Sequence, residues 1–425
     1  MTEEYAPDVL VIGAGVSGWP AAVAAARAGA KTLLLESAAL PGGQPVNQYV
    51  AMPDGGPRSG IVREYLDRLE SRYALTDRPV DCEWAFWYMP SDILRVVREM
   101  IAAEDGLTFI GDMRVRTLTL DGDTVTGCIA DNGHGRTIRV RAKFTVDATG
   151  SGALAEAAGC DVRYGEDSRS DFGESLAPAE RTGNVQMCTQ MYIAVRLKGA
   201  GWVPPGSLES GYGWSPGWSW SADAPVPEDM IRRNASAYLR WGGRFRCADT
   251  RDPEQTARTQ SEALDALSGE FDALREHGFA VMLPPELGIR EERRVMGEFV
   301  INQTDMMNGA IPDDSIIVHG RGIDIWKPSG GNTDYPRVKP YGMPYRSLIP
   351  KGKNGFLVVG KQMSGTHIAM ASYRVQTLLG QMGQGAGAAA AFCALRGLTD
   401  PRKVVFSDLQ KILGSPEQHL RCVRP

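Results

Sequence analysis

The chain has 425 residues, of which 43% are hydrophobic, so it can bury a large core, and its length favours two domains. A formal net charge of -5 gives no basic field for nucleic acid or for an anionic membrane, and we expect neither partner. The longest weakly polar run, Gly383 to Leu395, is shorter than the roughly 20 apolar residues that span a bilayer. Because the segment from Thr2 to Asp8 is acidic and unlike a signal peptide, we expect a cytoplasmic protein.

The cysteines are scattered along the chain without a Cys-x-x-Cys pair. They are Cys82, Cys128, Cys160, Cys188, Cys247, Cys393 and Cys422. This spacing argues against zinc, an iron-sulfur cluster and a redox disulfide. We therefore expect reduced cysteines with packing roles and no metal site.

The first expected element is a buried strand at Val9 to Ile12, because this continuous apolar run is typical of a parallel strand. Gly13 then allows a tight turn, Gly15 allows the backbone to approach a diphosphate, and Gly18 allows the next helix to pack closely. Glu36 ends the second apolar run, where a carboxylate can accept ribose hydroxyls and repel a 2′-phosphate. The pattern predicts an FAD or NAD site; a glycine turn in another β-α unit is the alternative.

Three further segments follow in chain order. Pro41 to Pro45 is a second glycine turn expected near the same pocket. Residues 107–146 contain short alternating runs separated by Asp-Gly and Asn-Gly, which favour hairpins, and they end in the buried run from Phe144 to Gly150. Near the C-terminus, the strand pattern from Gly355 to Gly360 precedes a helix rich in glycine and alanine.

Together these segments resemble two-dinucleotide-type flavoproteins with a glutathione-reductase-like FAD domain. Within that group, the chain is similar to the FAD-dependent oxidoreductase family that is distantly similar to fumarate reductase flavoproteins. The matching segments include Gly13 to Glu36, Gly42-Gly43 with Gly60 to Glu64, Asp147 to Gly152, Leu287 to Arg294, and Gly355 to Gly387.

The resemblance implies an α/β fold, in which a Rossmann-like FAD-binding domain with a parallel sheet carries an inserted α+β substrate or cap domain. We expect residues 1–160 to form the N-terminal part of the FAD domain, with a hairpin insertion at 107–143. Residues 161–344 would form the cap, residues 345–400 the C-terminal part of the FAD domain, and residues 401–425 a tail.

The resemblance also implies non-covalent FAD and places residues around it. Gly13, Gly15, Val16, Ser17 and Gly18 would face the pyrophosphate, Glu36 the ribose of the AMP half, and Gly42, Gly43 and Gln44 the diphosphate and flavin side. Arg114 and Val115 would border the adenine, Ala148, Thr149 and Gly150 would line a strand end, and Gly360, Ser372, Val375 and Gln376 would hold the ribityl chain and isoalloxazine.

The helix after Gln376 could direct its N-terminal dipole at the flavin. For Gly383 to Gly387, a tight helix-packing contact without the flavin is the alternative. No histidine adjoins Gly43-Gln44-Pro45, which disfavours a covalent flavin link.

Four residues are candidates for catalysis. His367 follows the C-terminal strand where the resemblance places the flavin ring, so it could relay a proton, or it could bond backbone at the turn. His319 ends an apolar run and could also point into the pocket. Arg290 and Arg374 could each hold a carboxylate or anchor the flavin, while the alternative for both is structural ion pairing, on a solvated strand in the case of Arg290.

The region between Cys160 and Tyr345 is rich in Trp, Pro and Gly. Its Trp218-Ser-Trp220 is similar to part of the motif of flavin-dependent halogenases, but Ser221-Ala222-Asp223 stands where that motif has Ile-Pro. We expect an aromatic loop of the cap instead, which could still wall the substrate pocket.

Because the chain carries one dinucleotide fingerprint, the flavin is expected to take a hydride from a small polar substrate at a CH-OH, CH-NH or CH-CH bond. Oxygen or an electron carrier would be the acceptor, and an oligomer is possible. Two alternatives remain open at this point: a reductase of an activated double bond, and a flavin-binding protein without catalysis.

Overall fold

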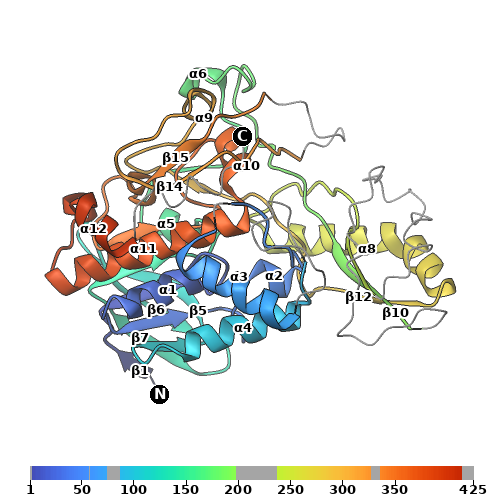
Figure 1. Cartoon of the computed structure of the whole chain (residues 1–425), viewed down its shortest axis with the longest axis horizontal. Coiled ribbons are helices and arrows are strands. Elements are labelled where there is room, and N and C mark those ends of the chain that lie inside the picture. Colours follow the sequence, from blue (N-terminus) through green and yellow to red (C-terminus); the bar gives the residue numbers. More distant parts are fainter. Residues whose placement is uncertain (1, 57, 74–86, 198–236, 327–335, 414–425) are drawn as a thin grey trace.

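The centre of the computed structural model is a five-stranded parallel sheet with the order β16-β8-β2-β3-β4 (Figure 1). The structure describes residues 2–56, 58–73, 87–197, 237–326 and 336–413. The sheet consists of β2 (Val9–Ile12), β3 (Thr32–Leu35), β4 (Leu107–Ile110), β8 (Phe144–Asp147) and β16 (Phe356–Val358). In the register of this sheet, Ile12 lies opposite both Leu35 and Asp147. The predicted α/β class with a parallel sheet is confirmed.

Both faces of the parallel sheet are covered, which explains the uninterrupted apolar run of β2. Val9 and Val11 belong to the core shared with helices α1 (Gly18–Arg27), α3 (Gly60–Tyr73), α4 (Pro90–Ala102) and α11 (Gln376–Arg396). Leu10 and Ile12 point the other way, into a core shared with a second sheet. Alternate side chains of a strand point to opposite faces, so a strand buried on both faces must be apolar throughout.

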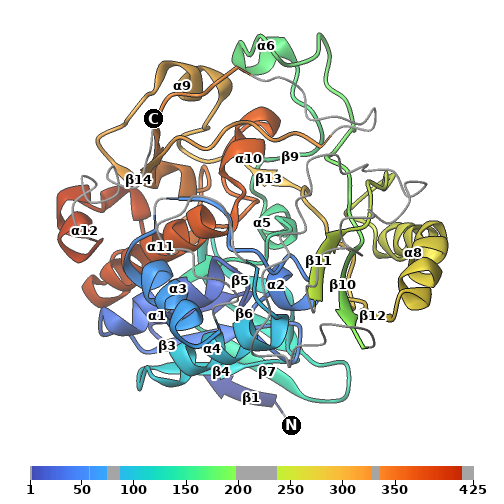
Figure 2. The same cartoon turned by 45° about the vertical axis from the view of Figure 1, so that its right-hand side comes forward.

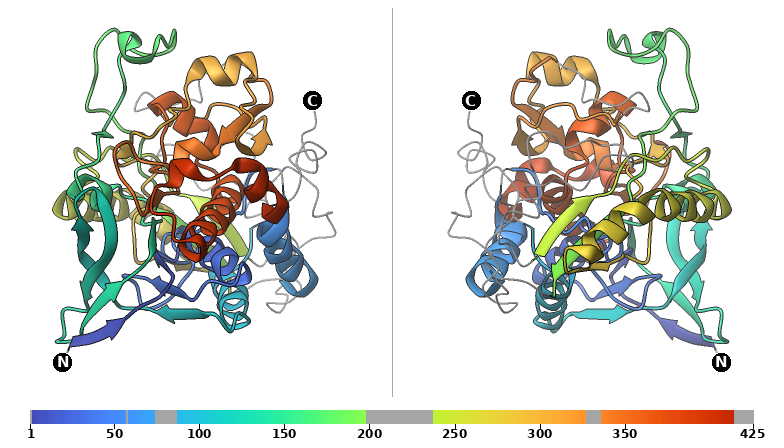
Figure 3. Two further views of the ribbon diagram at one scale, coloured as in Figure 1. Left: turned by 90° about the vertical axis from the view of Figure 1, so that its left-hand side faces the viewer. Right: turned by 90° about the vertical axis from the view of Figure 1, so that its right-hand side faces the viewer.

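The second sheet has the order β1-β7-β6-β5. It consists of β1 (Thr2–Tyr5), β5 (Arg114–Asp121), β6 (Thr124–Asp131) and β7 (Thr137–Arg141). The side views in Figure 3 show its teal strands and the blue helix α3 on opposite sides of the molecule. The hairpin prediction is correct for β5 to β7, whose neighbours are antiparallel. It is wrong for residues 107–110, because β4 pairs in parallel with β3 and extends the central sheet.

Helices α1 and α11 approach each other backbone to backbone. A Cβ atom on Gly383 would lie 2.1 Å from the carbonyl oxygen of Ser17, and one on Gly387 would lie 1.9 Å from that of Ala21. No side chain fits at either position. Of the two interpretations of Gly383 to Gly387, the structure therefore shows the tight helix-packing contact.

The insertion carries a small sheet of its own, ordered β11-β10-β12, with helix α8 (Pro253–Glu276) beside it (Figure 2). Its antiparallel strands are β10 (Met191–Arg196), β11 (Ala237–Trp241) and β12 (Phe279–Met282). Tyr192 packs with Leu274 of α8 and Phe279 of β12 in a separate core. The Trp218-Ser-Trp220 segment lies outside the described residues.

The remaining elements connect these layers. They are α2 (Gln44–Asn47), α5 (Ala153–Ala157), β9 (Val162–Arg163), α6 (Arg169–Phe172), β13 (Arg294–Val295), α9 (Gln303–Asn308), β14 (Ser315–His319), β15 (Tyr341–Pro344), α10 (His367–Tyr373) and α12 (Phe406–Leu413), with 3-10 turns at Tyr345–Leu348 and Pro401–Lys403. The expected tail is docked as far as α12, since Leu409 is fully buried in the main core. Among the described helices, none is long and apolar enough to cross a membrane.

Candidate active site

The turn after β2 requires glycine at two positions. Gly13 has a φ of +97°, and a Cβ atom there would lie 2.6 Å from the carbonyl oxygen of Ala148. A Cβ atom on Gly18 would lie 1.7 Å from the carbonyl oxygen of Gly13. Gly15 differs, because its Cβ would meet only the Cα atom of Gly43, at 3.9 Å. The backbone at Gly15 therefore borders open space, as a diphosphate site requires.

The two glycine turns meet at this point. Gly43 has a φ of +59°, and a Cβ atom there would lie 2.6 Å from the Cα atom of Gly15. The N–H of Gly42 donates to the carbonyl oxygen of Ala14 at 2.8 Å. Gln44 then begins α2 and reaches across the site, since its Nε2 donates to the carbonyl oxygen of Ile289 at 3.0 Å.

Glu36 lies at the end of β3, on the side expected for a ribose. Its carboxylate accepts the N–H of Ala14 at 2.6 Å and that of Ala38 at 3.0 Å. The backbone carbonyl of Glu36 accepts the N–H of Met113 at 2.9 Å, so Arg114 and Val115 begin β5 beside it. The side chain of Arg114 is exposed, which leaves its backbone as the part facing this edge of the sheet.

The carboxyl ends of β8 and β16 complete the same edge. The N–H of Ala148 donates to the carbonyl oxygen of Ile12, while Thr149 and Gly150 follow at the surface. Gly360 has a φ of +101°, and a Cβ atom there would lie 3.0 Å from Oγ of Ser17. Ligands of open α/β sheets bind outside the carboxyl ends of the strands, which is where these residues gather.

A cavity of about 390 Å³ adjoins this edge. Its wall contains Gln44, Val50, Met52, Asp54, Thr189, Met191, Trp241, Gly288, Ile289, Arg290, Arg321, Gly322, Ile323, Asp324, Trp326, Lys361, Arg374, Val375 and Gln376. Five predicted site residues therefore lie on one wall: Gln44, Arg290, Arg374, Val375 and Gln376. His319, His367 and Ser372 are not part of it.

The cavity wall carries more cationic than anionic side chains. Lys361 Nζ lies 2.9 Å from the carboxylate of Glu292, and Arg321 pairs with Asp54 at 2.8 Å. Arg290 donates through Nη1 to the carbonyl oxygen of Met187 at 2.8 Å and to Oγ1 of Thr189 at 2.6 Å.

Arg290 and Arg374 sit close enough to affect each other. Burial lowers the pKa of the Arg290 guanidinium, and the positive charge of Arg374 lowers it further. Both side chains remain cationic at neutral pH, because an arginine keeps its proton in proteins. An anionic ligand would relieve this repulsion.

Arg374 and Asp324 present unpaired atoms within the described part of the chain. Arg374 Nη2 donates to the carbonyl oxygen of Asp324 at 2.9 Å, but its Nε is buried without a hydrogen-bond partner. Asp324 Oδ2 accepts the indole N–H of Trp326 at 3.2 Å, while its Oδ1 is also buried without a partner. Leaving a donor and an acceptor buried and unpaired is costly unless a ligand satisfies them.

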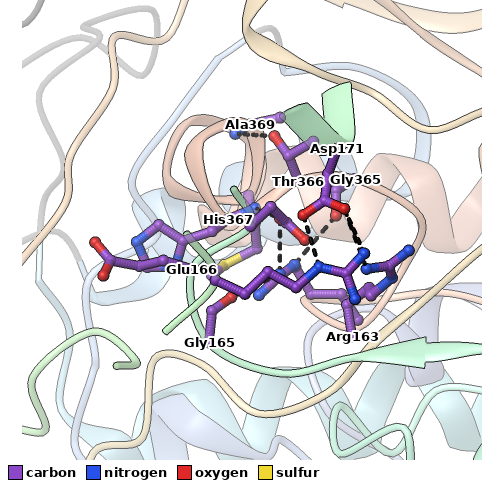
Figure 4. Close-up of polar contacts among 12 residues, drawn as sticks. Arg163, Gly165, Glu166, Asp171, Gly365, Thr366, His367 and Ala369 are labelled. Atoms are coloured by element: carbon purple, nitrogen blue, oxygen red, sulfur yellow. Dashed lines mark hydrogen bonds and ion pairs between the residues drawn. The ribbon is translucent and has the colours of Figure 1, made fainter. Parts of the chain in front are cut away.

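His367 lies behind the cavity wall rather than on it. It begins α10, beside the Thr366 side chain that caps this helix through the Ala369 N–H (Figure 4). Its Nδ1 lies 2.9 Å from the carboxylate of Glu291, and its backbone N–H donates to Asp167 at 3.0 Å.

The expected solvated strand at Arg290 to Arg294 is also wrong at its charged centre. Glu291 and Arg294 are both 1% exposed and bond each other, and Arg294 Nη2 lies 2.9 Å from Asp167. Burial raises the pKa of Glu291, but the charges of His367 and Arg294 outweigh it and the pKa is lowered. This buried network fixes the backbone that carries Arg290.

His319 and Ser372 are buried supports of the Arg321 loop. His319 Nδ1 accepts the N–H of Arg321 at 3.2 Å, and its ring lies 4.3 Å from that of Tyr341. Ser372 accepts the Tyr341 hydroxyl at 2.8 Å and donates to the carbonyl oxygen of Arg321 at 2.5 Å. Both residues are 0% exposed, so neither is positioned to touch a ligand directly.

Comparison with models of known families identifies the family of this chain. The family model described as FAD dependent oxidoreductase matches residues 8–413. This chain belongs to that family. Its members are enzymes that use FAD, so FAD is the cofactor. No curated protein sequence matches the chain at a significant level.

Three solved structures that match the chain are distantly similar to it. The geranylgeranyl bacteriochlorophyll reductase-like protein of Thermoplasma acidophilum is 13% identical with a TM-score of 0.45, and the match covers 99% of this chain and 86% of that one. The Mycobacterium smegmatis Sdh1 complex in its apo form is 15% identical with a TM-score of 0.44, covering 96% and 72%. The myxobacterial chondrochloren halogenase CndH is 14% identical with a TM-score of 0.43, covering 96% and 79%.

The residues present fit FAD. The open space at Gly15, the close approach of Gly43 and the carboxylate of Glu36 suit the diphosphate and ribose. Gln44, Val375 and Gln376 on the cavity wall suit the flavin end.

The cavity residues that were not candidates from the sequence include Asp54, Arg321, Asp324 and Trp326. They lie in irregular segments, where no periodic pattern signals which side chain points inward.

Proposed function

We propose that this enzyme is a dehydrogenase or oxidase of small organic molecules that carry an anionic group beside a hydroxyl or amine. The observation that supports this proposal is the unpaired donor and acceptor on one cavity wall, Arg374 Nε and Asp324 Oδ1. The donor suits an anionic oxygen of the substrate, and the acceptor suits a hydroxyl or ammonium proton.

The charged residues of the cavity have separate roles in binding and in proton transfer. Arg290 and Arg374 bind the anionic group, and the bonds of Arg290 to Met187 and Thr189 fix its direction. Asp324 holds and then accepts the proton of the hydroxyl or amine. FAD, when bound, would supply the hydride-accepting chemistry, with oxygen or a carrier as the final acceptor. Met191 and Trp241 add apolar wall that excludes water from the same cavity.

A second candidate is the reduction of an activated double bond, which the distant likeness to fumarate reductase flavoproteins suggested. The same cationic wall supports it, because Arg290 and Arg374 would also stabilise negative charge on a carboxylate conjugated to the double bond. In that case Asp324 would deliver a proton rather than accept one.

The test is an anaerobic screen of the purified yellow protein. Hydroxy acids and amino acids are added singly, and bleaching of the flavin absorbance is followed. We expect bleaching by at least one member of these classes. Re-oxidation of chemically reduced protein by an unsaturated acid, with no bleaching by any saturated acid, would establish the second candidate instead. Bleaching by neutral alcohols or amines alone would contradict both.

A further inference from the structure

Cys188 and Cys247 lie together although the sequence separates them widely. The N–H of Cys188 donates to the carbonyl oxygen of Phe245 at 2.8 Å, and the N–H of Phe245 donates back at 2.9 Å. Cys247 follows two residues later, so the two side chains belong to the same cluster of buried residues. Both are buried with Leu287 in a small apolar cluster. Both cysteines are free and buried, as expected from the sequence.

A small cavity lies beside one of the two cysteines. It has a volume of about 20 Å³ and is lined by Cys247 together with Gln186, Met187 and Arg246. A space of this size holds about one water-sized molecule. Hydrogen peroxide is of comparable size, whereas a protein thiol or glutathione is far larger. Of the two cysteines, Cys247 is the one that lines this space.

The surroundings give the two thiols different character. The interaction with Cys188, with smaller contributions from the Thr259 side chain and the backbone N–H of Asp249, lowers the pKa of Cys247 to about 6. The same interaction and burial raise the pKa of Cys188 well above its usual value. Thiolates, not thiols, react with peroxide, so Cys247 is the nucleophile and Cys188 the resolving group.

We propose that Cys188 and Cys247 are a peroxide-reactive dithiol that closes to a reversible disulfide in the folded protein. The sulfur of Cys247 attacks one oxygen of hydrogen peroxide, the O–O bond breaks, and Cys247 sulfenic acid and water form. The sulfur of Cys188 then attacks the sulfenic sulfur, the S–O bond breaks, and a disulfide and a second water form. Two thiols are oxidised, one peroxide is reduced, and a small dithiol reverses the change.

The pair adjoins the substrate cavity. Cys188 lies between Met187 and Thr189, which supply the two acceptors that hold Arg290. A disulfide at this position would join that segment to the chain at Cys247. The proposal itself does not depend on the substrate class.

The experiment uses the reduced FAD-bound protein, a few equivalents of hydrogen peroxide, and then denaturation in a thiol-alkylating reagent. Peptide mapping should find Cys188 joined to Cys247, with the intact protein lighter by about 2 Da before alkylation and restored by dithiothreitol. Cys247→Ser should abolish the product. Cys188→Ser should instead leave a sulfenic acid at Cys247 that dimedone labels.

The matched control is Cys160→Ser, another buried cysteine, whose pKa burial raises to about 11. It should retain the cross-link in full. Flavin absorbance monitors folding of every variant. The proposal is overturned if folded wild type forms no 188–247 link under peroxide, or if the link forms only after unfolding.

Discussion

The guanidinium of Arg290 lies over the indole ring of Trp326, with its central carbon 3.5 Å from the ring centroid. A cation held in this way is strengthened by the ring and cannot turn freely. Because Nη1 is already engaged by Met187 and Thr189, the side chain has one fixed orientation toward the cavity. A cation fixed in this way favours specific binding of an anionic group in one orientation, rather than a general attraction between the cavity and any anion.

Arg290→Gln should therefore weaken binding of an anionic substrate or competitive inhibitor about 10- to 150-fold, the value of a charged hydrogen bond of about 1.5 to 3 kcal/mol. Anaerobic titration of the flavin spectrum measures it. Arg346→Gln is the matched control, because Arg346 lies over Phe299 and pairs with Asp314 away from the cavity. An equal loss in both variants would show that Arg290 acts only through fold stability.

Asp324→Asn should retain FAD but slow flavin reduction by about 10²- to 10⁴-fold, the usual contribution of a positioned proton acceptor. The pH profile of reduction should also lose one limb. Asp54→Asn is the control in the same cavity, and its effect should stay within a few-fold: both aspartates are ion-paired with an arginine, but Asp324 also has a buried oxygen without a hydrogen-bond partner. Stopped-flow reduction distinguishes the two; unaltered kinetics in Asp324→Asn would remove it from the chemistry.

The glycine turns at the expected cofactor end were largely predictable from the sequence, because their geometry depends on the backbone. The spacing of Gly13, Gly15 and Gly18 predicts the tight turn between a strand and a helix. The position of Glu36 predicts a carboxylate at the end of the next strand. These features depend on residues that are close in the sequence, so the sequence alone is enough to predict them.

The substrate end was not predictable in the same way. His367 stands in the correct turn, but α10 directs its ring to Glu291 behind the wall. Asp324 and Trp326 occupy the wall from an irregular segment, and their positions depend on contacts with distant parts of the chain. Packing of this kind leaves no periodic signal in a single sequence. The same holds for Cys188 and Cys247. They lie in one cluster because the backbone of Cys188 pairs with that of Phe245, two residues before Cys247.

The glycine turn provides a direct test of the FAD site. Gly43→Ala should abolish or severely reduce FAD binding, because the added Cβ would lie 2.6 Å from the Cα atom of Gly15. Gly122→Ala is the control, because Gly122 also has a positive φ, +55° against +59°, but a Cβ atom there would meet nothing within 4 Å. The ratio of flavin to protein absorbance after purification measures the difference, and equal occupancy would contradict the assignment.

His319 makes stability depend on pH. Burial, with a smaller contribution from the charge of Arg321, lowers its pKa from 6.5 to about 3. Below pH 6.5, His319 therefore binds a proton in the unfolded chain but not in the folded chain. The free energy of unfolding falls as the pH drops from 6.5 toward 3. Between pH 7 and pH 5.5, the free energy of unfolding decreases by about 1 kcal/mol because of this group.

His319→Gln removes the titrating group while keeping an acceptor for the Arg321 N–H. The loss of Tm between pH 7 and 5.5 should be smaller in this variant than in wild type. His134→Gln, at an exposed loop position, should leave the wild-type loss unchanged. If His319→Gln shows the full pH-dependent loss, the group is not buried in its neutral form.

The most direct test of the central claim is to compare flavin reduction by one acid and by its primary amide in the same anaerobic protein. Acid and amide share the oxidisable carbon and differ in charge, so the comparison isolates the cationic wall formed by Arg290 and Arg374. We predict that, at the same low concentration, the acid reduces the flavin at least about tenfold faster than the amide does. The reason is that the acid makes one charged hydrogen bond that the amide cannot make. Equal or faster reduction by the amide would contradict an anionic substrate in this cavity.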